Sequence, residues 1–235
     1  MIEFIKDFCK EAEVTEDNYH NVYVTKGKSD TYPCVVAHSD QVQEGKCTPF
    51  VCGEIIFGTN TKQDDFEGLG ADDKNGIWVA LKCFQKFDAI KLAFFSSEET
   101  GCDGSSRSDL AFFDDCRFVL QCDRKNGNDF ISTARYVELC SKEFIKDCNI
   151  EAFGYKEAIG MTSDVAILKM RGLDVCCANI SCGYYEPHTC REYTKISELN
   201  NCLAFVQNII TNLTGVYNHT YSLRSKENRY GLTDL

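Results

Sequence analysis

The sequence predicts an α/β domain with three layers, in which a mixed, mostly parallel central sheet lies between two layers of helices. Strand-like and helix-like segments alternate along the 235 residues, a pattern typical of parallel strands joined by helices. The run YPCVVAHSD at 32–40 is apolar without alternation, as expected for a strand buried on both faces. With 43% hydrophobic residues and only three prolines, the chain suits one compact core without a long linker.

The elements follow in order from periodicity. A first helix is expected at the N-terminus, followed by strands at 21–27 and 32–40 and a strand pair at 48–58. The stretch GLGADDKNGIWVALKCFQKF places Ile77, Leu81 and Phe84 on one face of a helix that begins near Asp72. The later expected elements are strand 91–97, helix 106–113, strand 117–123, strand and helix pairs within 129–148 and 163–181, and an amphipathic helix at 196–213. Residues 1–218 form the predicted domain, and the polar stretch 219–235 is expected to be a tail.

The charge and the apolar pattern exclude several classes of partner. A formal net charge of -11 argues against nucleic acid, because phosphate binding needs clustered Lys and Arg. The start of the chain lacks the basic flank and apolar core of a signal peptide, and no run is long enough to span a membrane. We therefore expect a cytoplasmic protein with no membrane partner. The pattern predicts no oligomeric state.

Fifteen cysteines invite a disulfide or structural-zinc interpretation, but their spacing includes no CxxC pair. Most lie within apolar runs such as KCFQKF and NCLAFV. A reduced cysteine in such a run behaves as a small buried hydrophobic residue. Buried, reduced thiols are therefore expected, with a redox role as the less favoured alternative.

Polar residues cluster where the predicted strands end. His38 and Asp40 follow one strand, Glu98 and Glu99 a second, and Asp123 a third. In open α/β sheets, ligands bind at this carboxyl edge. Singly, each residue has an ordinary explanation, such as a turn residue, a solvated corner or a buried histidine.

Two further positions complete the cluster. Asp72 and Asp73 open a helix after a glycine-rich turn, where either could serve only as an N-cap, and His188 follows another strand and turn. Two histidines with several carboxylates predict a site for divalent metal, zinc first, with manganese or cobalt as alternatives. A pair of ions about 3.5–4 Å apart would need one bridging carboxylate.

Five motifs together resemble those of the co-catalytic di-zinc exopeptidases, and most of all the catalytic domain of peptidase T and its carboxypeptidase and acylase relatives. The resemblance covers about 21–213 and implies the zinc-peptidase-like fold. The motifs are HSD at 38–40, GLGADDKNGI at 68–77, SSEETG at 96–101, CD at 122–123 and EPHTCREY at 186–193.

The resemblance also implies a role for each matching residue. Asp72 would bridge two metal ions, with His38 and Asp123 completing the first ion's ligands and Glu99 and His188 those of the second. Asp40 would orient the imidazole behind it. Glu98 would act as the general base, and the peptide bond after the bridging aspartate would be cis.

The chain departs from the peptidase T pattern because the interval between Asp123 and His188 is too short for the lid domain that those enzymes insert there. That lid supplies an oxyanion-stabilising histidine in the relatives. Here the metals alone, or a tyrosine such as Tyr184 or Tyr185, would have to polarise the carbonyl. Asp164, at a helix start, would cap that helix or bind the substrate amine.

These observations favour a metal-dependent exopeptidase, an aminopeptidase or di- or tripeptidase, that acts on small peptides. An N-acyl amino acid amidohydrolase or deacetylase with the same metal chemistry is the first alternative. A metal-binding interaction module without turnover is the second, since a fold alone does not prove a function.

Overall fold

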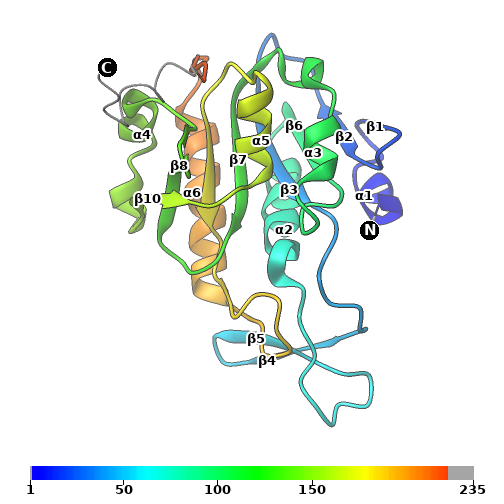
Figure 1. Ribbon diagram of the computed structural model, residues 1–235. Helices are drawn as coiled ribbons and strands as arrows, with labels where there is room; N and C mark the ends of the chain where they lie inside the picture. Colours follow the sequence, from blue (N-terminus) through cyan, green and yellow to red (C-terminus); the bar gives the residue numbers. More distant parts are fainter. Residues whose placement is uncertain (1, 222–235) are drawn as a thin grey trace, which may run out of the picture.

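The computed structural model describes residues 2–221, and Figure 1 colours them along the sequence from blue near the N-terminus to red near residue 221. Residue 1 and residues 222–235 lie outside the described part, so most of the predicted tail at 219–235 does too. No described helix is long and apolar enough to cross a membrane.

The central sheet is mixed, with a parallel centre, as predicted. Its strands follow the order β1-β2-β6-β3-β7-β11-β8-β10, and β9 pairs with β8. The neighbours β6, β3, β7 and β11 run parallel. The strands are β1 (Glu13–Glu16), β2 (Val22–Lys26), β3 (Tyr32–His38), β6 (Ile90–Phe95), β7 (Cys116–Arg124), β8 (Asp129–Ala134), β9 (Val137–Glu138), β10 (Lys156–Gly160) and β11 (Cys177–Ser181).

Helices cover both faces of this sheet, which confirms the three layers. Side chains of β3 alternate between the faces: Val35 and Ala37 join the core under α1, α2, α4 and α6, whereas Cys34 and Val36 join the core under η1 and α5. The helices are α1 (Ile2–Phe8), α2 (Ala71–Lys86), α3 (Asp103–Arg107), η1 (Leu110–Phe113), α4 (Lys142–Cys148), η2 (Ile150–Phe153), α5 (Asp164–Arg171) and α6 (Ile196–Asn212).

One expected element differs from its prediction. The helix at 106–113 is divided into α3 and η1, because Ser108 is extended and ends the first of them, and the Asp109 side chain accepts a hydrogen bond that starts the second. The cysteine prediction is confirmed, since all fifteen thiols lie in the described range, all are free and most are buried.

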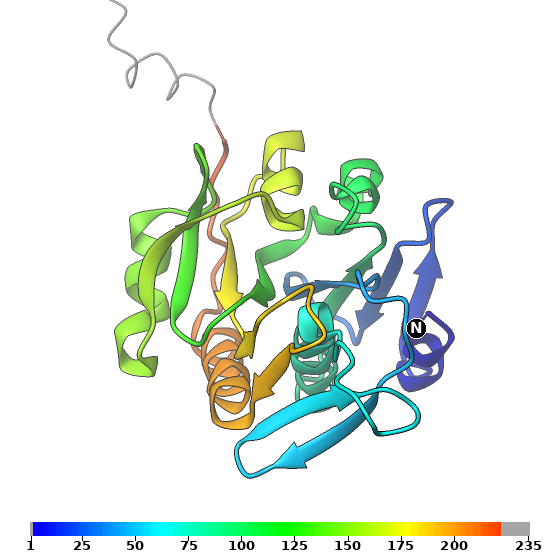
Figure 2. The same cartoon turned by 60° about the horizontal axis from the view of Figure 1, so that its bottom comes forward.

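A small antiparallel sheet stands beside the main one, at the N-terminal end of α2 (Figure 2). The strand pair expected at 48–58 forms its outer half, as β4 (Thr48–Cys52) and β5 (Ile55–Thr59). The inner half, β12 (Tyr184–Tyr185) and β13 (Tyr193–Lys195), comes from the far end of the chain. The loop between β12 and β13 contains His188, so the small sheet holds that histidine next to α2.

Candidate metal centre

The carboxyl ends of β3 and β7 bring the first two site residues together. His38 is the last residue of β3, and its side chain is fully buried. Asp123 lies near the end of β7, which pairs with β3 in parallel. The Asp123 Oδ1 atom is 3.7 Å from His38 Nε2. Parallel pairing thus produces the proximity that the sequence predicted for these two residues.

Asp72 lies between the two histidines. Its Oδ1 atom is 3.0 Å from His38 Nε2, and its Oδ2 atom is 3.3 Å from His188 Nε2. The peptide bond from Asp72 to Asp73 is cis, as the resemblance implies. A carboxylate that presents one oxygen to each of two imidazoles has the arrangement of a bridging ligand.

Glu99 completes the second half of the cluster. Its Oε2 atom is 3.0 Å from His188 Nε2, while its Oε1 atom is buried and has no hydrogen-bond partner among the described residues. Ligand atoms of His38, Asp72 and Glu99 all lie within 4.8 Å of one another. A buried carboxylate oxygen without a partner is costly, and a cation in this position would remove that cost. The residues therefore fit a divalent ion.

Burial and mutual repulsion dominate the electrostatics of the carboxylates in the cluster. Burial, followed by the charge of Asp72, raises the pKa of Asp123 well above its usual range and that of Glu99 to about 7. Burial lowers the pKa of the His38 imidazole, but hydrogen bonds to Asp123, Asp40 and Asp72 outweigh burial and raise it overall. A bound divalent cation would favour ionised carboxylates and a neutral imidazole.

Asp40 explains how two adjacent glutamates are held at this edge. Its Oδ1 accepts a hydrogen bond from the Glu98 amide at 3.0 Å and its Oδ2 one from the Glu99 amide at 3.1 Å. On its other side, the Asp40 backbone oxygen is 3.2 Å from His38 Nδ1, and the carboxylate is 3.5 Å away. Asp40 therefore links the imidazole to the loop of the acidic pair. Burial raises the pKa of Glu98, whose Oε1 accepts a long hydrogen bond from the Cys102 thiol at 3.5 Å.

Asp73 is also near the centre and, with His38 and Asp123, forms a second group of potential metal ligands. Its two oxygens are occupied by backbone amides, however: Oδ2 accepts from His38 at 3.1 Å and Oδ1 from Gly76 at 2.9 Å. The bond from Gly76, three residues on, resembles a capping bond in the first turns of α2, although the N-cap position itself is Gly70. The bond from His38 joins α2 to the end of β3.

Glu192 is a site residue that the sequence reasoning did not single out, although it lies in the EPHTCREY motif. It is fully buried, and its carboxylate accepts hydrogen bonds from the amides of Gly70 at 2.5 Å and Asp72 at 3.1 Å. Amides at a helix start point their N–H groups outward and favour an anion. Glu192 thereby ties the loop of His188 to the backbone of the bridging Asp72. No local pattern distinguishes this glutamate from a surface one.

Buried amides hold Asp123 in place. The Gln121 Nε2 group donates to Asp123 Oδ2 and to Asp164 Oδ2, each at 3.1 Å. The side chain of Asn179 on β11 bonds to the backbone of Asp123 in both directions, at 3.0 and 2.9 Å. Asp164 itself is fully buried, its Oδ1 has no partner among the described residues, and burial raises its pKa to about 7. It is the first residue of α5, whose N-cap is Ser163, and the Ser163 side chain makes no capping hydrogen bond.

The two candidate tyrosines point to different partners. The Tyr184 hydroxyl is 3.3 Å from Asp123 Oδ1. The Tyr185 hydroxyl instead donates to Glu198 Oε2 at 2.6 Å, and its ring stacks on Tyr193 with centroids 5.1 Å apart. Of the two, Tyr184 is the one whose hydroxyl contacts a predicted metal ligand.

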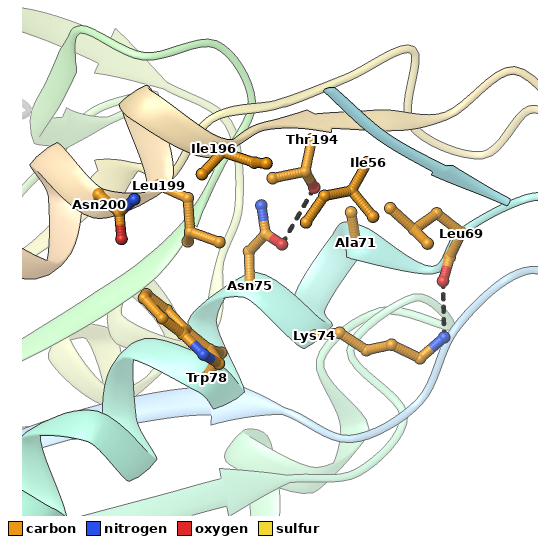
Figure 3. Close-up of a pocket in the computed structure, with 10 residues that line it drawn as sticks. All are labelled: Ile56, Leu69, Ala71, Lys74, Asn75, Trp78, Thr194, Ile196, Leu199 and Asn200. Carbon is orange, nitrogen blue, oxygen red and sulfur yellow. Dashed lines mark hydrogen bonds between the residues drawn. The ribbon is translucent and has the colours of Figure 1, made fainter. Parts of the chain in front are cut away.

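A cavity of about 310 Å³ lies between α2, α6 and the small sheet (Figure 3). Its lining includes Ala71, Asn75 and Trp78 but none of the predicted site residues. Asn75 accepts a hydrogen bond from the Thr194 hydroxyl at 3.1 Å and donates one to the Cys182 carbonyl at 3.0 Å. Asn75 therefore links the N-terminal part of α2 to Thr194 of β13, and Glu192, just before β13, provides a second link to the same end of α2.

Solved peptidase structures share this arrangement of strands and helices. An aminopeptidase PepT from Bacillus cereus matches with a TM-score of 0.71 and 14% identity over 90% of this chain and 92% of that one. A tripeptidase from Staphylococcus aureus matches with a TM-score of 0.67 and 15% identity over 88% and 91%. An aminopeptidase from the archaeon Desulfurococcus kamchatkensis matches with 0.65 and 12% over 91% and 89%.

These matches establish the fold. The central sheet flanked by helices, with its small antiparallel sheet, is zinc-peptidase-like. No protein-family model and no curated protein sequence matches the chain.

Proposed function

We propose that this chain is a metal-dependent exopeptidase, an aminopeptidase or di- or tripeptidase, that hydrolyses small peptides. The observation that supports this most is the Asp72 carboxylate, which presents one oxygen to His38 and the other to His188. Folds alone host many functions, so the proposal depends on these side chains, and the peptidase neighbours add support.

His38, Asp72 and Asp123 would hold one divalent ion, and Asp72, Glu99 and His188 a second, with zinc the best match to histidine and carboxylate ligands. Ions bound there would polarise the scissile carbonyl and lower the pKa of water to about 7. Glu98 would take a proton from the attacking water and deliver it to the leaving nitrogen. Burial raises the pKa of Glu98, which makes its carboxylate a better proton acceptor. Asp40 would position Glu98 through the hydrogen bond that its carboxylate accepts from the Glu98 backbone amide.

The test uses zinc-loaded protein, its Glu98→Ala variant and a Glu13→Ala control, in which an exposed glutamate of β1 is removed. Each is incubated with di- and tripeptides and with N-acyl amino acids, and products are identified by mass spectrometry. Loss of amino-terminal residues with wild type and control, but not with Glu98→Ala, supports the proposal. Deacylation alone would favour an amidohydrolase, and bound zinc without any product would favour an interaction module.

A further inference from the structure

The carboxylate of Glu98 has one side-chain partner among residues 2–221. Its Oε1 atom accepts a hydrogen bond from the Cys102 thiol, with a sulfur–oxygen distance of 3.5 Å. Sulfur is larger than nitrogen or oxygen, so this separation is an ordinary one for a thiol donor. No described residue donates to Oε2, and Asp40 binds the backbone amide of Glu98 but not its carboxylate. The thiol therefore sets the direction of the carboxylate.

The loop after β6 folds back so that Cys102 lies beside Glu98. The amides of Gly101 and Cys102 both donate to the Glu98 carbonyl at 2.9 Å. Cys102 has a left-handed φ of 59° and is the N-cap of α3. Glycine adopts this conformation freely, whereas a residue with a side chain adopts it at a cost. The side chain placed there at that cost is the one that contacts Glu98.

The surroundings of Cys102 keep its thiol protonated. The residue is 2% exposed. Burial, followed by the charges of Asp164 and Glu98, raises the pKa of the thiol far above its usual range. Nucleophiles and metal ligands are thiolates, not thiols, so these surroundings disfavour a reactive or zinc-binding cysteine. A protonated thiol can still donate a hydrogen bond, and this is the function that the surroundings of Cys102 allow.

We infer that Cys102 is a positioning residue for the general base. Its thiol holds Oε1 of Glu98 and leaves Oε2 as the oxygen that takes the proton from the attacking water. A catalytic group that is already oriented has less freedom to lose when the substrate arrives. The inference rests on the proposed function, in which Glu98 is that base. A single neutral hydrogen bond contributes modestly, so its loss should lower kcat roughly three- to tenfold.

The first test detects the hydrogen bond without turnover, by infrared spectroscopy of metal-free protein. Subtracting the spectrum of Cys102→Ala from that of wild type isolates the S–H stretching band of Cys102 among the fifteen cysteines. The same subtraction in a Glu98→Met background should give a band at higher wavenumber, because the thiol has lost its carboxylate acceptor. The band of Cys148, a fully buried thiol of α4, isolated in the same way, should not move. An unmoved Cys102 band would overturn the inference.

The second test measures peptide hydrolysis by zinc-loaded variants. Cys102→Ala should lower kcat by the factor given above and leave KM and zinc content unchanged. Cys102→Ser, which keeps a donor, should recover part of that loss, and the control Cys148→Ala should keep the wild-type kcat. Unchanged kcat in Cys102→Ala, or a loss of zinc with it, would overturn the inference.

The two tests together distinguish this inference from the proposed function. Hydrolysis by wild type with an unmoved Cys102 band would refute the inference alone. A band that moves as expected, in a protein that hydrolyses no peptide, would refute the proposed function but not the hydrogen bond between Cys102 and Glu98.

Discussion

The two halves of the candidate metal centre differ in how the fold holds them. The His38 side chain is 0% exposed, ends a central strand and has a contact at each ring nitrogen. The His188 side chain is 48% exposed and sits in a loop with a left-handed φ of 64°. Half of the centre is thus built into the core and half is attached from the surface. We expect the buried half to bind metal more tightly, because less ordering is needed there.

Replacing the adjacent residues Glu98 and Glu99 one at a time should give the largest expected effect, a loss of turnover in one variant and of metal in the other. Glu98→Ala should keep both metal ions but lower kcat on the order of a thousandfold, because a general base contributes about 10²- to 10⁴-fold. Glu99→Ala should instead lose metal from the exposed half. Turnover on a dipeptide and metal content by mass spectrometry distinguish the two. Full activity with Glu98→Ala would remove that residue from the mechanism.

We also expect the buried carboxyl groups around the His38 half to lower the free energy of unfolding. Asp164, which shares the Gln121 amide with Asp123, tests this expectation. Its folded pKa of about 7 exceeds the ordinary 3.8, so its favourable contribution is complete below about pH 4 and is lost as pH rises through 7. Asp164→Asn cannot ionise, so its stability relative to wild type should increase between pH 5 and 8. A pKa difference of about three between the folded and unfolded protein limits this change in unfolding free energy to about 4 kcal/mol.

Urea unfolding of the metal-free proteins at several pH values measures this difference. Asp30→Asn, at an exposed aspartate, is the control and should follow wild type throughout. A pH-independent difference for Asp164→Asn would show that the buried carboxyl is stabilised by a partner in the folded protein.

Replacing the two histidines separately compares the halves directly. His188→Ala should reduce zinc stoichiometry from two to one and leave the tighter ion in place. His38→Ala should weaken the tighter site about a hundredfold, and the weaker one as well, because Asp72 loses a contact that orients it. Calorimetric zinc titration measures both. Equal losses in the two variants would contradict the proposed asymmetry.

Glu192 connects the halves, and its replacement should have the smallest effect. Glu192→Gln keeps the shape of the side chain but removes the anion at the start of α2, so zinc affinity should fall about tenfold, as for other residues that orient ligands. Glu186→Gln, an exposed change in the same loop, should leave zinc affinity unchanged. Unaltered affinity in Glu192→Gln would mean that the amides of Gly70 and Asp72 need no charge to hold the bridging carboxylate.

The sequence by itself determined the fold class and the clustering of the predicted metal ligands. Apolar runs such as the one ending at His38 mark central parallel strands, and parallel strands bring their carboxyl ends to one edge. Polar residues directly after such runs must therefore meet, as Asp123 and His38 do. This inference needs only the order of residues along each strand.

Tertiary structure decided what depends on segments far apart in the chain. The pairing of β13 with β5 sets Tyr193 opposite Phe57, and burial of Glu192 against α2 gives an otherwise ordinary glutamate its contacts with Gly70 and Asp72. The unequal exposure of the two histidines arises in the same way. Periodicity records which face of an element is apolar, but the partner of each polar side chain depends on which elements pack together, and that is a property of the whole folded chain.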